Sequence, residues 1–313
     1  MNPIALMPDE DRGARVIVHA RRLYTQGIPP VARETHLAAV LHGTLSTPGS
    51  LTRLQLGLIA GTALGLPAGT TDAFATALEY FHTASLLLDD LPSMDDAQLR
   101  RGRPCAHVLH GEGSTVLGAL AFITRGYRLV WDALAGSPGP VREAAAAHVE
   151  RCLGASGVLD GQSLDLHFNE TDRSNRTVAR IALGKTVSLL RLSLVTPALL
   201  AAAGARERLL IDRVSVAWGL AYQIADDFSD LGSAVPAGKT PGRDRRCGRP
   251  NLVIAGGCAL AQARLRRLLG LLVRAHHDLV LLRPGWCALG PLIDRFVAAS
   301  SAHLHELAAT RCA

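Results

Sequence analysis

Apolar residues recur every three to four positions along most of the 313-residue chain, in long segments rich in Ala and Leu. This spacing places apolar side chains on one face of an α-helix, whereas the alternating β-branched pattern of strands is nearly absent. We therefore expect an all-α protein. The predicted helices span about 9–24, 31–43, 51–64, 71–91, 113–135, 140–160, 176–203, 206–230, 252–274 and 289–309.

Gly- and Pro-rich segments separate the predicted helices. The clearest breaks are at residues 27–30, 66–69, 135–140 and 232–250. None of these segments is long enough to link independent domains, and the chain shows no repeat of fixed period. We therefore expect one helical domain over residues 1–313, built as a bundle.

The composition agrees with a globular helical protein and excludes several other classes. Hydrophobic residues make up 48% and aromatic residues 4% of the chain, unlike disordered, collagen-like or disulfide-rich proteins. The net charge is +6, but the arginines are spread along the chain without a basic run or interleaved aromatic residues. This distribution argues against nucleic-acid binding.

Cysteine spacing and apolar runs bear on the location of the protein. The six cysteines form no CxxC pair and no metal-binding pattern, as expected for thiols in a reducing, cytoplasmic compartment. The first 15 residues lack the apolar core of a signal peptide, and the best apolar run, 189–203, contains Arg191 and Pro197. We therefore expect neither a signal peptide nor a transmembrane segment.

Lysine is nearly absent from the chain. Only Lys185 and Lys239 occur among the 33 basic residues, and the rest are arginine. Such a bias is typical of a GC-rich genome, so the number of surface arginines says little about function. The two lysines stand against that bias and mark positions where chemistry is expected.

A first cluster of carboxylates ends the helix predicted over 71–91. It holds four aspartates within eight residues: Asp89, Asp90, Asp95 and Asp96. Like charges at helical spacing repel, so cations are expected among them. Pro92 should end the helix just after Asp90 and let a short loop turn Asp95 back toward the pair. Oxygen ligands favour a hard divalent ion such as Mg²⁺, the alternative being a solvated acidic turn.

A second cluster, Asp226, Asp227 and Asp230, ends the helix predicted over 206–230. Asp226 and Asp230 are four residues apart, so both carboxylates project from one helical face with Asp227 beside them. Carboxylates at a helix C-terminus oppose the helix dipole and need compensation. Two such clusters in one chain favour two metal platforms over two solvated charge patches.

The two lysines and a pair of arginines complete the candidate chemistry. Lys185 lies in a Gly-Lys-Thr sequence, and Lys239 in a Gly-Lys-Thr-Pro-Gly-Arg-Asp sequence. An ammonium group suits a single phosphate oxygen, whereas Arg100 and Arg101 offer bidentate forks. Together with carboxylates and a divalent metal, these groups indicate a diphosphate site. The Gly-Lys-Thr sequence lacks the upstream glycine and the strand of a P-loop, which excludes a nucleoside triphosphatase.

Several of these motifs follow one another in the order found in a known family. They are residues 79–102, 161–166, 184–186, Gln223 with the second cluster, and 238–244. The chain thereby resembles the trans-isoprenyl diphosphate synthases, or polyprenyl synthetases, over roughly residues 35–255, and is most similar to bacterial geranylgeranyl diphosphate synthases of carotenoid pathways. The resemblance implies an all-α bundle around a central cavity, with the two aspartate motifs facing each other across its mouth, and a homodimer.

The resemblance also implies a reaction: condensation of an allylic prenyl diphosphate, here farnesyl diphosphate, with isopentenyl diphosphate to give geranylgeranyl diphosphate (C20). Three Mg²⁺ ions per site would draw charge from the leaving group so that the allylic C–O bond ionises. Their implied ligands are Asp89, Asp90, Asp95, Asp226, Asp227 and Asp230. The implied contacts of the allylic diphosphate are Arg100, Lys185 and Lys239, and those of isopentenyl diphosphate are Arg53, His82 and Arg101. The implied catalytic residues are Lys185 and two oxygen dipoles that steady the carbocation, Thr186 and Gln223.

Product length is argued from side-chain size. Ala84 and Ser85 lie about one helical turn before Asp89, on the side where the prenyl tail must grow. Related farnesyl-forming enzymes carry an aromatic ring at one of these positions, so two small residues favour C20 over C15. A deeper residue such as Phe122 is the alternative floor of the channel. His82, on an apolar helix, has its own alternative as an ordinary core histidine.

One departure from the family pattern affects the isopentenyl diphosphate half of the site. The family carries Gly-Lys-Arg-x-Arg-Pro near residue 50, whereas this chain has Gly-Ser-Leu-Thr-Arg-Leu over 49–54 and keeps only Arg53. Serine at position 50 removes an ammonium group, at a cost of about 1.5–3 kcal/mol of binding. Two alternatives therefore stay open: a cyclase or prenyltransferase of the same fold that ionises a prenyl diphosphate without isopentenyl diphosphate, and a regulatory subunit of a partner synthase. The second is the weaker, because both aspartate motifs are present.

Overall fold

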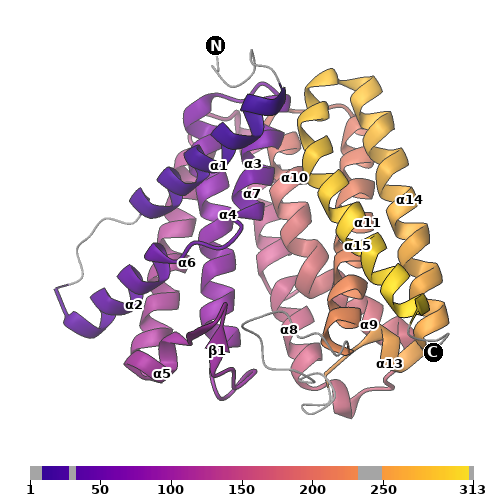
Figure 1. Ribbon diagram of the computed structural model, residues 1–313. Coiled ribbons are helices and arrows are strands. Elements are labelled where there is room, and N and C mark those ends of the chain that lie inside the picture. The colour runs from indigo at the N-terminus through magenta and orange to yellow at the C-terminus, as the bar shows by residue number, and fades with distance from the viewer. Residues whose placement is uncertain (1–8, 28–32, 232–248, 310–313) are drawn as a thin grey trace. The chain divides into compact units, whose positions relative to one another are not determined.

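The computed structural model describes residues 9–27, 33–231 and 249–309 (Figure 1). These residues are almost entirely helical, and their only strands are β1 (Leu99–Arg100) and β2 (Arg103–Pro104), a short antiparallel hairpin. The prediction of an all-α protein is confirmed. No helix in these ranges is long and apolar enough to cross a membrane.

The described residues form two compact units, one up to Ala145 and one from Ala146 on. Besides the hairpin, the first unit contains α1 (Asp9–Gln26), α2 (Thr35–Ser46), α3 (Thr52–Ala63), α4 (Ala68–Asp89), α5 (Ala106–His110) and α6 (Glu112–Leu134). Helix α7 (Gly139–Leu153) crosses the boundary. The second unit continues with α8 (Val158–Leu166), η2 (Phe168–Glu170), α9 (Asn175–Ala182), η3 (Leu183–Val187), α10 (Ser188–Leu200), α11 (Ala205–Leu231), α13 (Leu252–Gly256), α14 (Cys258–Leu282), η4 (Pro284–Leu289) and α15 (Gly290–Ala309). The single domain expected from the sequence stays a prediction.

Three predicted helices are each divided in the structure. The helix expected over 176–203 forms α9 and α10, joined by the π-helical turn η3. The single helix expected over 140–160 is wrong, because the chain breaks between α7 and α8 at Gly157, where a Cβ would collide with main-chain oxygens at the end of α7. The helix expected over 252–274 is interrupted at Gly257, whose φ of 79° lies in the left-handed region, and α14 then continues to Leu282. The hairpin, α5 and the 3₁₀ turn η4 are short elements that the apolar spacing does not predict.

Helix α4 is the centre of the first unit and packs against α3 and α6. Its interior side chains include Tyr80, whose ring lies 5.6 Å from that of Tyr24 and 5.3 Å from that of Phe122, measured between centroids. Close packing of α3 depends on Gly57, because a Cβ there would lie 3.0 Å from Ala75 Cα. These contacts bury both helices along most of their lengths, so the C-terminal end of α4 rests on a packed core.

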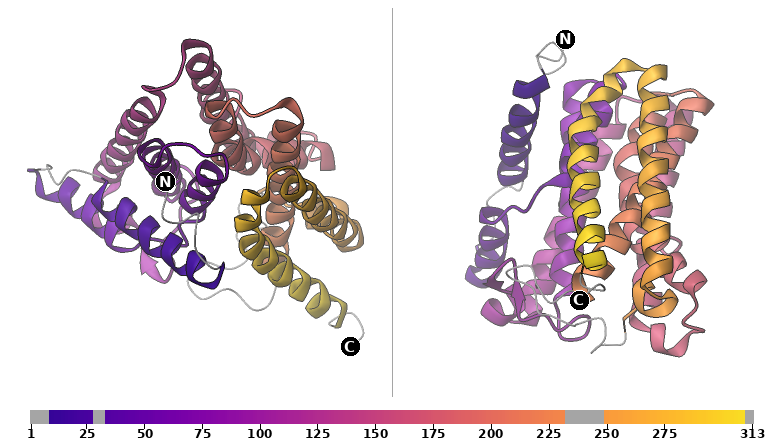
Figure 2. Two further views of the ribbon diagram at one scale, coloured as in Figure 1. Left: turned by 90° about the horizontal axis from the view of Figure 1, so that it is seen from above. Right: turned by 45° about the vertical axis from the view of Figure 1, so that its right-hand side comes forward.

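Helix α11 is the centre of the second unit and packs against α10 and α14. Its apolar side contributes Ala221, Ile224 and Phe228 to a buried cluster that also holds Phe168 and Leu265. Helices α14 and α15, coloured orange to yellow, lie side by side in Figure 2. The apolar face of α11 therefore packs in the core. The polar residues near the C-terminal end of α11 lie at the positions of the helix that do not belong to this apolar cluster.

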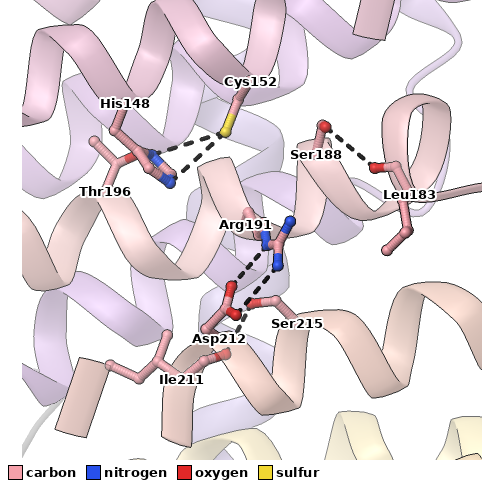
Figure 3. Close-up of polar contacts among 9 residues, drawn as sticks. All are labelled: His148, Cys152, Leu183, Ser188, Arg191, Thr196, Ile211, Asp212 and Ser215. Carbon is pink, nitrogen blue, oxygen red and sulfur yellow. Dashed lines mark hydrogen bonds and ion pairs between the residues drawn. The ribbon is translucent and has the colours of Figure 1, made fainter. Parts of the chain in front are cut away.

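Several polar side chains of α7, α10 and α11 make contacts between these helices in the second unit (Figure 3). His148 Nδ1 lies 3.0 Å from Thr196 Oγ1, and Cys152 Sγ lies 3.7 Å from His148 Nε2. The Arg191 guanidinium donates to both carboxylate oxygens of Asp212, at 2.6 and 3.2 Å. Burial lowers the pKa of His148 to about 4 and raises the pKa of Cys152 to about 11, so both side chains are neutral at pH 7.

The buried His148 predicts a pH-dependent stability. Its pKa is near 6.5 in the unfolded chain and about 4 in the folded chain, so the unfolded chain binds the proton more tightly. The folded state therefore loses up to about 2 kcal/mol from this group as the pH falls from 7 to 5. We expect His148→Asn to reduce the pH dependence of the unfolding free energy by about that amount in urea denaturation. An unchanged pH dependence would contradict a buried neutral imidazole at this position.

Candidate functional site

The loop after α4 turns back on the end of the helix. Helix α4 stops at Asp89, and the amide N–H groups of Asp95 and Ala97 donate to the main-chain oxygens of Asp89 and Asp90, at 3.0 and 3.1 Å. Pro92 lies within this loop and prevents the helix from continuing. The predicted return of Asp95 toward the aspartate pair is confirmed.

The two aspartates of this pair have different surroundings. Asp90 is only 4% exposed, and its two carboxylate oxygens accept hydrogen bonds from Arg100 Nε and Nη2, at 2.7 and 2.6 Å. This bidentate ion pair compensates the burial of the carboxylate. Asp89 and Asp95 are partly exposed instead. Asp96 is exposed. The first cluster therefore combines one buried carboxylate bound to an arginine with three carboxylates at or near the surface.

The β1–β2 hairpin carries Arg100 and Arg101. Arg101 and Gly102 form its turn with φ angles of 54° and 75°, both in the left-handed region. The Arg101 guanidinium lies against Gly49, where any Cβ would collide with it, and its Nη1 donates to the main-chain oxygen of Thr47 at 3.4 Å. Because Gly49 has no side chain, the Arg101 guanidinium can pack against the segment that leads into α3.

Arg53 and His82 are in direct contact, with Arg53 Nη1 lying 3.0 Å from His82 Nε2. A guanidinium can only donate, so Nε2 is the acceptor and the ring proton resides on Nδ1. His82 Nδ1 is buried and has no hydrogen-bond partner among the residues described. Burial, and after it the charge of Arg53, hold the pKa of His82 well below its usual value, so the ring is neutral at pH 7. His82 is therefore not a core histidine with both nitrogens satisfied.

Glu79 of α4 holds the N-terminus of α3. Its Oε2 accepts from the main-chain N–H of Leu54 at 3.0 Å, and the residue is 4% exposed. Leu51, at the N-cap position, has a φ of 52° and makes no side-chain capping bond, so Glu79 supplies the missing acceptor from a neighbouring helix. Burial raises the pKa of Glu79. This contact sets the first turn of α3, which places Arg53 beside His82.

In the second unit, two glycines bring Lys185 to Asp165. Gly161 of α8 and Gly184 of the π-helical turn η3 are in contact, and a Cβ on Gly184 would lie 2.8 Å from Gly161 Cα. Beside this contact, Lys185 Nζ donates to Asp165 Oδ2 at 2.7 Å. Arg249 Nη1 donates to the main-chain oxygen of Asp165 at 3.1 Å. A larger residue at either glycine would separate the two segments, so the position of Lys185 depends on both.

Gln223 joins Thr186 to the second aspartate cluster. Thr186 Oγ1 donates to Gln223 Oε1 at 2.9 Å, and Gln223 Nε2 donates to Asp227 Oδ1 at 3.0 Å. The other carboxylate oxygen, Asp227 Oδ2, accepts from the main-chain N–H of Leu252 at 2.7 Å. Asp227 is 1% exposed, whereas Asp226 is partly exposed. The second cluster thus repeats the division of the first, with one buried and one more exposed aspartate in the adjacent pair.

Neither Glu79 nor Asp165 has a chemical role that the sequence predicts. Both are buried, at 4% and 7% exposure. A buried carboxylate requires a hydrogen-bond donor or a cation. The available signal was an acidic residue within a helix of largely apolar or small neighbours. Its partner, a helix N-terminus in one case and Lys185 in the other, depends on packing that the sequence does not display.

The partly exposed carboxylates suit a Mg²⁺ ion whose remaining ligands come from a bound substrate. Among the described residues, no three Asp, Glu, His or Cys side chains converge closely enough to hold a metal ion by themselves. Mg²⁺ is typically bound through one or two carboxylates together with water and phosphate oxygens. Asp89 with Asp95, and Asp226 with Asp230, are partly exposed oxygen donors of this kind.

The remaining predicted residues are Lys239, Ala84 and Ser85. Lys239 lies outside the described residues. Ala84 is 2% exposed, whereas Ser85 is partly exposed and its Oγ donates to the main-chain oxygen of His82 at 2.8 Å. Ser85 lies three residues after His82 and four before Asp89, so these three share one face of α4. The alternative floor residue, Phe122, is fully buried against Tyr80.

Comparisons with known proteins agree with one another. Residues 34–279 match the polyprenyl synthetase family model. The chain is 30% identical over 264 residues to a geranylgeranyl diphosphate synthase of Pantoea ananas, covering 83% of this chain and 85% of the relative. It is 31% identical over 243 residues to a farnesyl diphosphate synthase of Escherichia coli strain K12, covering 77% and 79%. Its fold is similar to that of a geranyltransferase from Helicobacter pylori complexed with magnesium and isoprenyl diphosphate, with a TM-score of 0.77, 21% identity, and coverage of 96% and 98%.

Proposed function

Because the chain belongs to the polyprenyl synthetase family, we propose that it transfers the prenyl group of an allylic diphosphate to isopentenyl diphosphate and that geranylgeranyl diphosphate (C20) is the product. The relatives are named as geranylgeranyl and farnesyl diphosphate synthases, so the family leaves the product length open. Farnesyl diphosphate (C15) is the allylic substrate in this proposal.

Arg100 and Lys185 bind the allylic diphosphate in this proposal. They are 30% and 29% exposed at their side chains, so each can meet a phosphate oxygen from the solvent side. Asp90 and Asp165 already hold these cations, which reduces the conformational freedom lost on binding. Lys239 is the third proposed contact.

The partly exposed carboxylates are the proposed Mg²⁺ ligands: Asp89 and Asp95 in the first unit, and Asp226 and Asp230 in the second. Mg²⁺ held there, in the proposed number of three ions, would neutralise the charge that develops on the diphosphate as the allylic C–O bond breaks. The resemblance also implied Asp90 and Asp227 as ligands. These two residues are only 4% and 1% exposed, and their carboxylates accept hydrogen bonds from protein groups, so we leave them out of the proposed metal set.

The contact between Arg53 and His82 is the main observation in support of the proposed condensation with isopentenyl diphosphate. A buried donor without an acceptor costs about 1–3 kcal/mol, and His82 Nδ1 is such a donor. A phosphate oxygen would satisfy it, and the adjacent guanidinium of Arg53 favours an anion. Arg101 is the second cation of this half-site. These groups support a site for a second diphosphate, that of isopentenyl diphosphate.

Purified protein incubated with Mg²⁺, farnesyl diphosphate and labelled isopentenyl diphosphate tests the proposed function. We expect labelled geranylgeranyl diphosphate, and no product when Mg²⁺ is chelated. A cyclic hydrocarbon from a prenyl diphosphate alone would favour a cyclase of the same fold. No turnover of any prenyl diphosphate would favour the regulatory subunit.

Ser85 is expected to control product length. A phenylalanine at this position would place a ring on the face of α4 that carries Asp89, where the prenyl tail extends. We expect Ser85→Phe to shift the product from C20 to C15 when geranyl diphosphate is supplied, as measured by chromatography of the dephosphorylated products. Ser85→Thr is the control and should retain C20. An unchanged C20 product in Ser85→Phe would place the growing chain elsewhere.

Ser50 favours the second candidate function, ionisation of a prenyl diphosphate without isopentenyl diphosphate. The residue is exposed, and its Oγ lies 2.7 Å from Thr52 Oγ1. A neutral hydroxyl paired with a second hydroxyl offers a diphosphate far less than an ammonium group does. The half-site around Arg53 is therefore expected to bind isopentenyl diphosphate more weakly than the family pattern would. Such a site suits an enzyme that uses a different prenyl acceptor or none.

Restoring the lysine distinguishes these candidates. If isopentenyl diphosphate is a substrate, Ser50→Lys should lower its KM about tenfold, because the new ammonium group binds a phosphate oxygen. The KM of farnesyl diphosphate should change less than about twofold. Ser46→Lys adds the same charge at an exposed position four residues earlier and is the control. Equal effects of the two substitutions would show that position 50 has no specific role.

Assembly and compartment complete the proposal. Helix α6 exposes four large apolar side chains at helical spacing, which form one stripe: Leu117, Leu120, Tyr127 and Trp131. Such a stripe suits an isologous contact in a homodimer. Four cysteines in the described ranges are free thiols, in agreement with the reducing cytoplasm: Cys105, Cys152, Cys258 and Cys287.

A further inference from the structure

The hydrogen bonds from Asp227 to Thr186 have a defined direction. A carboxylate accepts and cannot donate, and one of its oxygens already accepts from the Leu252 N–H at 2.7 Å. The other oxygen faces the Gln223 side-chain amide at 3.0 Å. Because this neighbour offers no proton, Gln223 must turn its NH₂ group toward Asp227. The Gln223 carbonyl oxygen must then face Thr186.

The direction of the Thr186 hydroxyl follows from the orientation of Gln223. A hydroxyl group has a single proton, and Thr186 donates it to Gln223 Oε1 at 2.9 Å. What remains on the oxygen are lone pairs, the negative end of the dipole. Thr186 is 9% exposed and belongs to the π-helical turn η3, so the residue is held by its backbone as well. The Thr186 oxygen is therefore left as an acceptor: it can accept a hydrogen bond or stabilise a nearby positive charge.

We propose that Asp227 is a positioning residue that, through Gln223, directs the Thr186 hydroxyl so that its lone pairs face the positive charge developing on the allylic carbon. The proposal rests on the proposed function, since it concerns the ionisation of a prenyl diphosphate. An oxygen dipole fixed in advance stabilises such a charge without reorganising during the reaction. Asp227 acts two hydrogen bonds away and does not touch the substrate.

The surroundings of Asp227 distinguish it from its neighbour Asp226. Asp227 is 1% exposed, and its main-chain oxygen accepts from Asn251 Nδ2 at 3.1 Å. Asn251 also caps the N-terminus of α13 through the amides of Val253 and Ile254. A metal ion at the Asp227 carboxylate would have to displace the bonds from Leu252 or Gln223. Asp226, in contrast, is partly exposed, so a metal ion can approach its carboxylate from solvent.

Asp227→Asn should reverse the chain of hydrogen bonds without changing its shape. The asparagine oxygen must accept from the Leu252 N–H, so its NH₂ group faces Gln223. The Gln223 amide then turns over and offers its own NH₂ group to Thr186, whose proton is forced to the other side. We expect kcat to fall about tenfold to a hundredfold, with the KM of the allylic diphosphate within about threefold of the unmodified value.

A second substitution should restore the original direction. Glutamate at position 223 accepts both from the NH₂ group that Asp227→Asn introduces and from the Thr186 hydroxyl. The double variant Asp227→Asn with Gln223→Glu therefore keeps the charge and returns the Thr186 lone pairs to their place. We expect it to recover at least about tenfold in kcat over Asp227→Asn alone. No recovery would overturn the proposal. If Asp227→Asn fails to fold, Gln223→Met breaks the same link and should lower kcat to a similar extent, and an unchanged kcat would also overturn the proposal.

Calorimetry with Mg²⁺ and inorganic pyrophosphate supplies a readout that does not need turnover. We expect Asp227→Asn and Gln223→Met to bind pyrophosphate with a Kd within about threefold of the unmodified chain, whereas Asp226→Asn should weaken binding at least about tenfold. Weakening in Asp227→Asn equal to that in Asp226→Asn would make Asp227 a metal ligand. If the unmodified chain showed no prenyl transfer, the proposed function would be refuted. The comparison of pyrophosphate binding among the variants could still be made, because it does not depend on turnover.

Discussion

Replacing Asp89 with asparagine is expected to lower kcat for prenyl transfer by at least about a thousandfold while leaving the chain folded. Asp89 ends α4 and is partly exposed, so the change removes a charge from the surface and not from the core. As a proposed Mg²⁺ ligand, it supports the charge of the departing diphosphate. Steady-state kinetics at several Mg²⁺ concentrations, together with circular dichroism, measure both parts of this expectation.

Asp96 provides a matched control in the same loop. It is exposed, and its φ of 47° is one that asparagine adopts as readily as aspartate. Asp96→Asn should therefore retain kcat within about threefold. A loss of less than about tenfold in Asp89→Asn would show that Asp89 is not a metal ligand. Equal losses in both variants would indicate that only the total negative charge of the loop matters.

Replacing Asp90 with alanine is expected to have a different consequence, a loss of about 3–5 kcal/mol in the free energy of unfolding. The Asp90 carboxylate is 4% exposed and binds the Arg100 guanidinium through two hydrogen bonds. Without this carboxylate, the Arg100 guanidinium, which is 30% exposed, loses both of these hydrogen bonds. Urea denaturation followed by circular dichroism measures the change.

Two further variants test the origin of that loss. Asp89→Ala, one residue earlier, should cost less than about 1 kcal/mol because its carboxylate is partly exposed. The double variant Asp90→Ala with Arg100→Met should be more stable than Asp90→Ala alone, since it also removes the unpaired charge. If Asp90→Ala cost no more than Asp89→Ala, the ion pair would contribute little to the fold.

Most helices could be predicted from the sequence, because apolar spacing reports directly which face of a helix is buried. The helices predicted over 51–64 and 71–91 correspond to α3 and α4, and that over 206–230 to α11. The missed breaks within predicted helices occur at glycines, where the break depends on the backbone conformation. Gly257 interrupts a segment whose apolar pattern is continuous, and Gly157 does the same between α7 and α8.

The candidate site could be predicted only in part. Residue type and order along the chain suggested the candidate site residues, namely the six aspartates, the lysine of η3 and the contact residues proposed in the first unit. They presented the aspartates of each adjacent pair as equivalent. In the structure, Asp90 binds Arg100 and Asp227 binds Gln223, and both are buried, whereas Asp89 and Asp226 are partly exposed. Neighbouring residues on a helix point about 100° apart, so adjacent identical residues meet different surroundings.

The sequence by itself determined the all-α class, the family and the residue types of the proposed diphosphate and metal sites. These properties depend on local periodicity and on chemical identity. The tertiary structure alone decided which carboxylate meets which distant partner: Glu79 with the start of α3, Asp165 with Lys185, and Asp227 with the N–H group of Leu252. The partners lie between 20 and 25 positions apart along the chain. Hydrogen bonds act only over about 3 Å, so packing, which sets these distances, also sets the role of each carboxylate.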